Sequence, residues 1–170
     1  MKVIVVGLLV IFCGVSSARQ VDPKIRVRVT LNDDTFTDST VDVNTAFNVN
    51  VSTAVRLVNI YTDPTTTATL QPIGRVTISG TLPSSLFVFI GAGDFPTNDQ
   101  ANINEAGTTW GGIQGNPGGT SDESKIVLAG AINGNLTGGV QVGRIFRFEI
   151  NGDLGASVTA RQSGEIASTG

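Results

Sequence analysis

The chain of 170 residues has no histidine, and its one cysteine, Cys13, lies in an apolar N-terminal stretch. Without histidine, Ser-His-Asp and Cys-His nucleophile systems are excluded, and so are the usual zinc sites. Charged residues make up only 15% of the chain and form no basic cluster, which argues against nucleic acid and anionic membranes as partners. The chemistry that remains for catalysis is that of carboxylates.

The first eighteen residues have the pattern of a secretory signal peptide. Lys2 supplies the positive start, residues 3–15 form an apolar run, and residues 16–18 place small side chains at the cleavage position. The run is short for a helix that spans a bilayer, and Phe12 stands where a lipoprotein signal needs a small residue. We therefore expect a secreted or cell-surface protein with no membrane span after cleavage.

Cleavage after residue 18 would remove Lys2 and the only cysteine. The net charge would then move from −3 to about −4, and no disulfide could form. Small secreted domains often depend on disulfides. Their absence predicts a fold held by burial and by a long, regular set of backbone hydrogen bonds.

The composition predicts an all-β protein. Helix formers are scarce, Gly, Thr, Asn, Val and Ile are frequent, and no stretch keeps an apolar period of 3.6 residues. Apolar and polar residues alternate over residues 25–31, 41–51 and 55–61, as in strands with one buried face. Because these strands share no motif with the rest, residues 19–70 are predicted to form an N-terminal β cap.

A nine-residue motif at 132–140 returns eighteen residues later at 150–158, with Ile, Asn, Gly, Leu and Val at matching offsets. Residues 78–86 form an earlier copy. The even offsets carry the apolar residues, which in a strand all lie on one face. Stacked motifs would place like residues together, and the expected pairs are Ile132 with Ile150, Leu136 with Leu154, and Val140 with Val158.

The repeat predicts right-handed parallel β-solenoid coils over residues 71–170, interrupted by a long loop at 91–125. An antiparallel β-sandwich is the alternative. Since a further Gly-x-Ile lead-in starts at Gly164, we expect the coils to continue beyond the end of the chain. The alternative is that the last coil is an open edge to which a partner binds. The structural corners would be glycines and the Asn or Asp beside them, which tolerate tight turns: Gly80, Gly134, Asn135, Gly152 and Asp153.

The motifs I-N-G-N/D-L-x-x-x-V and G-x-I in residues 132–166 resemble the Gly-rich parallel β-helix repeats of large secreted or cell-surface bacterial proteins. The resemblance implies an extracellular structural or adhesive protein, and it carries over no catalytic residue. The stretch departs from the calcium-binding nonapeptide repeats, because it lacks their G-G-x-G-x-D pattern.

The loop at 91–125 holds most of the candidate site residues, and long loops often carry function. Trp110, between threonine and two glycines, is either a platform on which a sugar stacks or a residue that fixes its loop to the body. Asp94 and Asp99 are the candidate ligand-binding acids in the same loop. Calcium is the one cofactor that the sequence leaves open, and its candidate oxygen ligands are Asp94, Asn98, Asp99 and Glu105.

No spacing sets two carboxylates at catalytic distance; the candidate acids are Asp94, Asp99, Glu105, Asp122, Glu123, Glu149 and Asp153. Asn50 and Asn135 begin N-glycosylation sequons.

From the repeat, the signal peptide and the lack of an assembled catalytic set, we expect a non-enzymatic surface or extracellular-matrix protein, with adhesion among its roles and polysaccharide or other surface proteins as partners. The alternative is a carbohydrate-active β-helix enzyme or a carbohydrate-binding module.

Overall fold

The computed structural model describes residues 24–42, 45–62, 73–91, 108–115, 122–132 and 134–168. The predicted signal peptide at 1–18 lies outside these residues. Most of the described residues lie in strands and none lies in an α-helix, which is the all-β class that the composition predicts. The strands are β1 (Lys24–Leu31), β2 (Phe36–Asp42), β3 (Phe47–Val51), β4 (Val55–Thr62), β5 (Val76–Gly80), β6 (Leu86–Ile90), β7 (Thr108–Trp110), β8 (Ile113–Gly115), β9 (Ile126–Ile132), β10 (Gly134–Leu136), β11 (Val140–Ile150) and β12 (Val158–Ser168), with one 3-10 turn, η1 (Glu123–Lys125).

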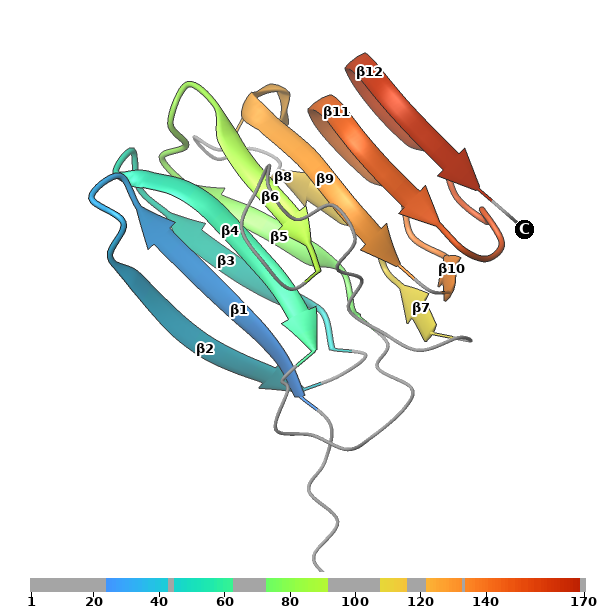
Figure 1. The fold of residues 1–170 in the computed structure, drawn as a ribbon, viewed down its shortest axis with the longest axis horizontal. Helices are drawn as coiled ribbons and strands as arrows, with labels where there is room; N and C mark the ends of the chain where they lie inside the picture. The colour runs from blue at the N-terminus through green and yellow to red at the C-terminus, as the bar shows by residue number, and fades with distance from the viewer. Residues whose placement is uncertain are drawn as a thin grey trace, which may run out of the picture.

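One mixed sheet contains most of these strands, in the order β2-β1-β4-β6-β9-β11-β8-β5-β3, and β12 pairs with β11. β1 pairs antiparallel with β2 and with β4. β11 pairs in parallel with β9 over residues 144–150 and with β8 at Val140. The sheet therefore folds over at β11, and β3, β5 and β8 run behind β4, β6 and β9 (Figure 1). The result is a nearly closed barrel.

The predicted right-handed parallel β-solenoid is thus wrong as the fold class, because antiparallel and parallel strands share one sheet that nearly closes on itself. The antiparallel β-sandwich also fits poorly, since most of the pairs between strands are parallel. The physical reason is that the motif specifies only how two successive segments pair. It contains no information on how β1 and β2, which lack the motif, join the same sheet.

The local pairing predicted from the two close copies of the motif is confirmed. Ile132 pairs with Ile150, Val140 with Val158, and a parallel bridge joins Leu136 to Leu154. The earlier copy at 78–86 does not stack on these residues. Its first residue, Ile78, pairs with Val49 and Gly115.

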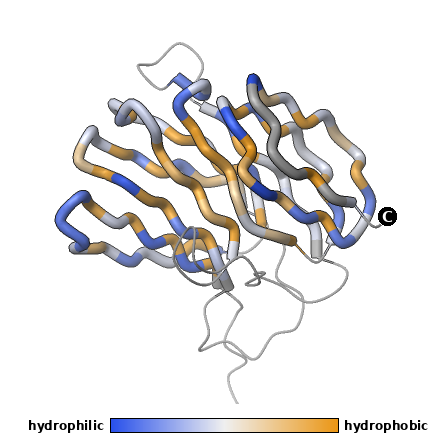
Figure 2. The backbone as a smooth tube through the Cα atoms, turned by 45° about the horizontal axis from the view of Figure 1, so that its top comes forward, coloured by the Kyte–Doolittle hydropathy of each residue, from blue (hydrophilic) through white to orange (hydrophobic). Residues whose placement is uncertain are grey.

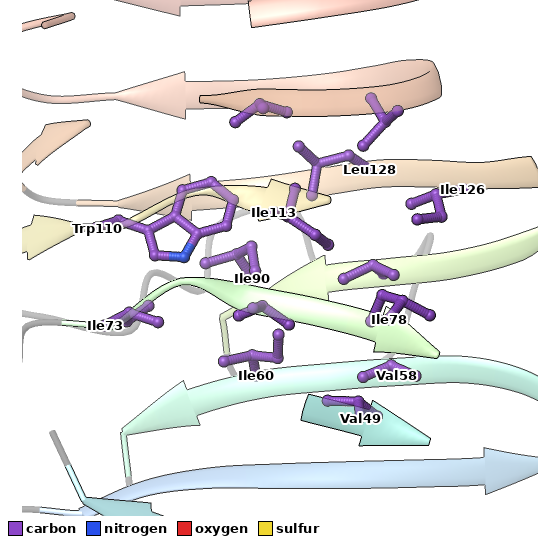
Figure 3. Packing of buried hydrophobic residues seen from close by; sticks show 14 of the residues in the cluster. Val49, Val58, Ile60, Ile73, Ile78, Ile90, Trp110, Ile113, Ile126 and Leu128 are labelled. Carbon is purple, nitrogen blue, oxygen red and sulfur yellow. The ribbon is translucent and has the colours of Figure 1, made fainter. Parts of the chain in front are cut away.

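Apolar side chains from both halves of the barrel fill its interior. In Figure 3 the labelled side chains of Val58, Ile60 and Ile90 from one half lie near Ile78 and Ile113 from the other, and all five belong to one buried cluster. Hydrophobic and hydrophilic positions alternate along many of the strands (Figure 2), as a barrel with a dry inside and a wet outside requires.

The segment Leu86–Ile90 is an exception to this alternation, because both of its faces are covered. Leu86, Val88 and Ile90 are fully buried in the main cluster. Phe89 belongs to a second buried cluster with Leu57 and Ala129. The burial of both faces suits the continuous apolar sequence of this segment.

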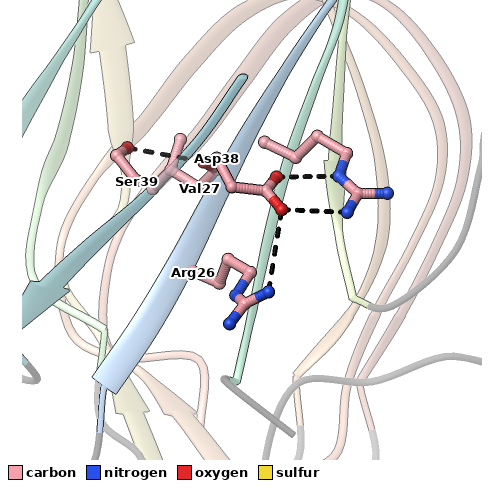
Figure 4. A network of polar contacts seen from close by, with 5 residues as sticks. Arg26, Val27, Asp38 and Ser39 are labelled. Carbon is pink, nitrogen blue, oxygen red and sulfur yellow. Dashed lines mark hydrogen bonds and ion pairs between the residues drawn. The ribbon is translucent and has the colours of Figure 1, made fainter. Parts of the chain in front are cut away.

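A polar network stabilises the antiparallel hairpin of β1 and β2 (Figure 4). The Arg28 guanidinium donates two hydrogen bonds to the Asp38 carboxylate, at 2.8 and 2.9 Å. The Arg26 guanidinium lies 3.6 Å from the same carboxylate. The Arg28 guanidinium also lies over the ring of Phe36, with its central carbon 3.9 Å from the ring centroid. A cation that lies over the face of an aromatic ring is attracted to that ring.

This network predicts how stability changes with acid. The hydrogen bonds from Arg28 hold the pKa of Asp38 below its usual value, so the folded state favours the ionised carboxylate. The stabilisation is present above the unfolded pKa, about 3.9, and is lost as the pH falls through the lower folded value. Urea unfolding measured over a series of pH values should show this acid loss in the native chain and a weaker one in Asp38→Asn. Identical acid limbs for the two proteins would contradict the prediction.

Candidate functional site

One half of the barrel carries a row of uncharged polar residues on its outer face, with one residue from each successive strand. In the register of the strands, Asn48 of β3 pairs with Thr77 of β5, and Thr77 pairs with Gln114 of β8. Gln141 of β11 pairs with Thr159 of β12. The pair of Val140 with Ile113 places the next residues, Gln141 and Gln114, side by side. We call Asn48, Thr77, Gln114, Gln141 and Thr159 the polar row.

The pleat of the strands turns the polar row outward. The members stand next to apolar residues that belong to the core or pack against it. Val76 and Ile78, on either side of Thr77, are fully buried. Because side chains alternate between the faces of a strand, the row lies on the solvent side. Asn48, Gln141 and Thr159 are exposed, whereas Thr77 and Gln114 are half-buried. Neighbouring strands lie about 4.8 Å apart, so five strands give a row about 19 Å long.

Two hydrogen bonds between side chains order this face. The Arg75 guanidinium donates to the side-chain oxygen of Gln114 at 3.3 Å. The Ser79 hydroxyl donates to the side-chain oxygen of Asn50 at 3.5 Å. Because Arg75 occupies the oxygen of the Gln114 amide, the orientation of this central amide is set by the protein itself. The face is therefore partly organised before any ligand arrives.

The Thr159 end of the row opens into a hollow, which we call the end groove. Its volume is about 300 Å³, and it is lined by Asp122, Glu123, Ser124, Gln141, Val142, Thr159, Ala160 and Arg161. One wall is η1, which lies directly on β11. A Cβ on Gly143 would come within 1.7 Å of the Ser124 carbonyl oxygen, so only glycine allows this close approach.

The charges of the end groove are mixed. Asp122 accepts a hydrogen bond from the Ser124 backbone N–H at 2.9 Å. Hydrogen bonds from Ser124 lower the pKa of Asp122, and the positive charges of Lys125 and Arg161 act in the same direction. Asp122 therefore favours its ionised form, and Arg161 lines the same groove.

A smaller hollow lies at the Asn48 end of the row. Its volume is about 160 Å³, and it separates β3 from the β1–β2 hairpin. Its lining combines three polar residues with five apolar ones: Asn48, Asn50, Ser39, Phe47, Val49, Val27, Val29 and Val41. The polar row thus runs between two depressions of the surface.

Trp110 lies inside the barrel core. Its side chain is fully buried, and its ring centroid is 5.3 Å from that of Phe148. A residue that fixes its loop to the body has this placement, while a sugar platform needs an open ring face. The predicted ligand and metal residues Asp94, Asn98, Asp99 and Glu105 lie outside the described residues. Within the described part of the chain, no three acidic, cysteine or histidine residues gather as a metal site would require.

The remaining candidate acids lie in three separate places. Asp122 and Glu123 meet in the end groove. Glu149 accepts a hydrogen bond from Arg147, its partner on the same strand. Asp153 is exposed near the bridge from Leu136 to Leu154. Only the first two therefore share a site.

The predicted corner residues occupy different kinds of position. Gly80 has a φ of 89°, where other residues are strained. A Cβ on Gly152 would lie 2.6 Å from the Gly134 carbonyl oxygen. Gly134 and Asn135 belong to β10, and the Asn135 side-chain oxygen accepts the Asp153 backbone N–H at 2.9 Å. The Asn135 side chain thus joins the two copies of the motif.

The polar row was not predicted, because its members are isolated polar residues in five separate segments. One signal was present, since Gln141 and Thr159 stand eighteen residues apart at the same offset from the motif.

Comparison with protein-family models, with curated proteins and with solved structures finds no match to this chain. In the part of the chain that the structure describes, no helix is long and apolar enough to cross a membrane.

Proposed function

We propose that the protein is a non-enzymatic, secreted protein of a cell surface or extracellular matrix, and that it adheres to polysaccharide through the polar row. The observation that carries the proposal is the row itself: five uncharged polar residues, one from each of five adjacent strands, on one outer face. The signal-peptide pattern at residues 1–18 supports the extracellular location.

The chemistry of the row suits sugar hydroxyls. Asn and Gln amides, and the Thr hydroxyl, each donate and accept hydrogen bonds. A sugar hydroxyl does the same, so each contact satisfies both partners. Every such bond contributes only about 0.5–1.5 kcal/mol net, and adhesion then comes from many of them acting together. The paired backbone holds these side chains in place, which lowers the entropy cost of binding.

The end groove gives no comparable support for catalysis. Glycoside hydrolysis needs two carboxyl groups that face each other across the scissile bond, about 5–9.5 Å apart. Asp122 and Glu123 are adjacent residues at the start of η1, and Asp122 is engaged in capping that turn. Such a pair resembles the acidic start of a turn more than an acid and a nucleophile.

Binding to insoluble polysaccharides tests the proposal. We expect the protein to sediment with at least one of cellulose, chitin and β-1,3-glucan particles. The double variant Thr77→Val, Gln114→Met keeps the size of both side chains and removes their hydrogen-bonding groups. Loss of two such contacts should weaken binding about tenfold, as measured by depletion isotherms.

Thr37→Val serves as the matched control, because Thr37 is exposed on β2, outside the polar row. Thermal unfolding of all three proteins would establish that each is folded. The proposal fails if the native protein binds none of the three polymers. It also fails if the double variant binds as tightly as the Thr37→Val control.

A further inference from the structure

The arrangement of the polar row restricts how a polymer can lie on the protein. We infer that the ligand is a neutral, extended polysaccharide chain that lies across the strands, from β3 to β12, and not along any one of them. This inference rests on the proposed function and names the class and orientation of its ligand.

The lengths of the strands decide the orientation. β3 and β5 have five residues each and β8 has three, so each of these three strands offers at most two or three outward positions. β11 is longer, but its exposed polar residues Gln141 and Arg144 are followed by the exposed Phe146, whose side chain carries no hydrogen-bonding group. Those positions are about 6.6 Å apart, since each residue rises about 3.3 Å. Across the strands, the row offers five polar groups at about 4.8 Å intervals. Among the side chains that the structure describes, the longest uninterrupted set of hydrogen-bonding groups therefore runs perpendicular to the strands.

The charge of the face selects a neutral ligand. All five members of the row are uncharged. Arg75, the cation beside its centre, is hydrogen bonded to Gln114. At the Thr159 end, the end groove presents Asp122 and Glu123 together with Arg161. An acidic polysaccharide would meet the two carboxylates there, and a basic one would meet the arginines.

The absence of aromatic residues from the row determines which side of the sugar is contacted. Amides and hydroxyls recognise the hydroxyl groups at the edges of a sugar ring, whereas flat ring faces are recognised by stacking on aromatic side chains. A chain that lies in an extended form presents such hydroxyls at regular intervals. The affinity should therefore grow with each sugar that reaches another strand.

A length series tests this inference. With soluble oligosaccharides of the polymer bound most strongly, from disaccharide to octasaccharide, calorimetric affinity should rise until the ligand spans about 19 Å and then level off. Raising the salt concentration tenfold should change the affinity by less than about twofold, because neutral contacts are not screened.

Variants at the two ends of the row distinguish a ligand that lies along the whole row from a ligand that binds at one point of it. Asn48→Leu and Thr159→Val should weaken the longest oligosaccharide several-fold and leave the disaccharide unaffected. Gln114→Met should weaken both. If the disaccharide binds as tightly as the octasaccharide, the ligand occupies one hollow and the inference is overturned, while the proposed function stands. A strong loss of affinity in salt would also overturn it, because charged residues would then carry the binding.

Discussion

Gly138→Ala is expected to lower the free energy of unfolding by about 3 kcal/mol or more, which would be among the largest effects of a single methyl group. A Cβ on Gly138 would lie 1.7 Å from the Gly111 carbonyl oxygen and 2.3 Å from its carbon. Both atoms belong to the backbone, so no side-chain rotation can relieve the overlap. The chain could accept the methyl group only by separating two hydrogen-bonded segments.

Those segments form a corner of the barrel. The backbone N–H of Thr137 donates to the Trp110 carbonyl at 2.9 Å, and the N–H of Gly111 donates to the Ile73 carbonyl at 2.9 Å. Gly74, one layer further along, would also place a Cβ within 1.9 Å of the Thr45 carbonyl oxygen. Glycines are thus required at this corner in several successive layers, and the strain of one alanine would disturb its neighbours.

The adjacent residue provides a matched control. A Cβ on Gly139 would meet only the Ser157 carbonyl oxygen, at 3.8 Å, which is ordinary contact. Gly139→Ala should therefore change the free energy of unfolding by less than about 0.5 kcal/mol. Urea unfolding at 25 °C, with the slopes compared as well as the midpoints, measures both variants. Equal stabilities for the two variants would contradict the close backbone packing at Gly138.

Trp110→Ala should be the second large loss, about 3–5 kcal/mol, because it removes the largest fully buried side chain of the core. The loss includes the aromatic contact with Phe148 at 5.3 Å between centroids. A loss of this size is a large fraction of the total stability of an ordinary domain. Chemical unfolding followed by circular dichroism measures it, since the variant lacks the only tryptophan.

Trp110→Phe is the control that separates packing from polarity. Among the described residues, the indole N–H of Trp110 has no hydrogen-bond partner, and such a buried group costs about 1–3 kcal/mol. Phenylalanine keeps most of the packing and removes that group, so this variant should lose about 1 kcal/mol or less. If Trp110→Ala unfolds like the native chain, the ring does not lie in the core.

The sequence allowed the local pairing to be predicted and left the closure of the sheet open. Strands were expected over residues 25–31 and 55–61, and they occur as β1 (Lys24–Leu31) and β4 (Val55–Thr62). The eighteen-residue step correctly pairs Ile132 with Ile150. The motif recurs in register only in neighbouring segments, however, and the barrel depends on where β11 divides its pairing between β9 and β8. No local pattern reports that division.

The candidate site was harder to predict, for a different physical reason. Gln114 and Thr77 are adjacent only because β8 pairs with β5, so their proximity follows from tertiary register. Trp110 could have been exposed or buried on sequence grounds, because the glycines beside it suit a loop as well as a tight corner. Those glycines, Gly111 and Gly112, lie against backbone atoms of other layers. A sequence shows that glycine is present and does not show what approaches it.

The long strand β11 has a consequence for cooperativity. Its first residues belong to the half of the barrel that bears the polar row, and its last residues belong to the other half. Neither half can open without loosening a backbone segment that the other half also needs. Local opening should therefore be suppressed across the junction, and the two halves should behave as one unit in the exchange of their amide hydrogens with water. A polymer bound to the half of the barrel that bears the polar row would then slow the opening of both halves.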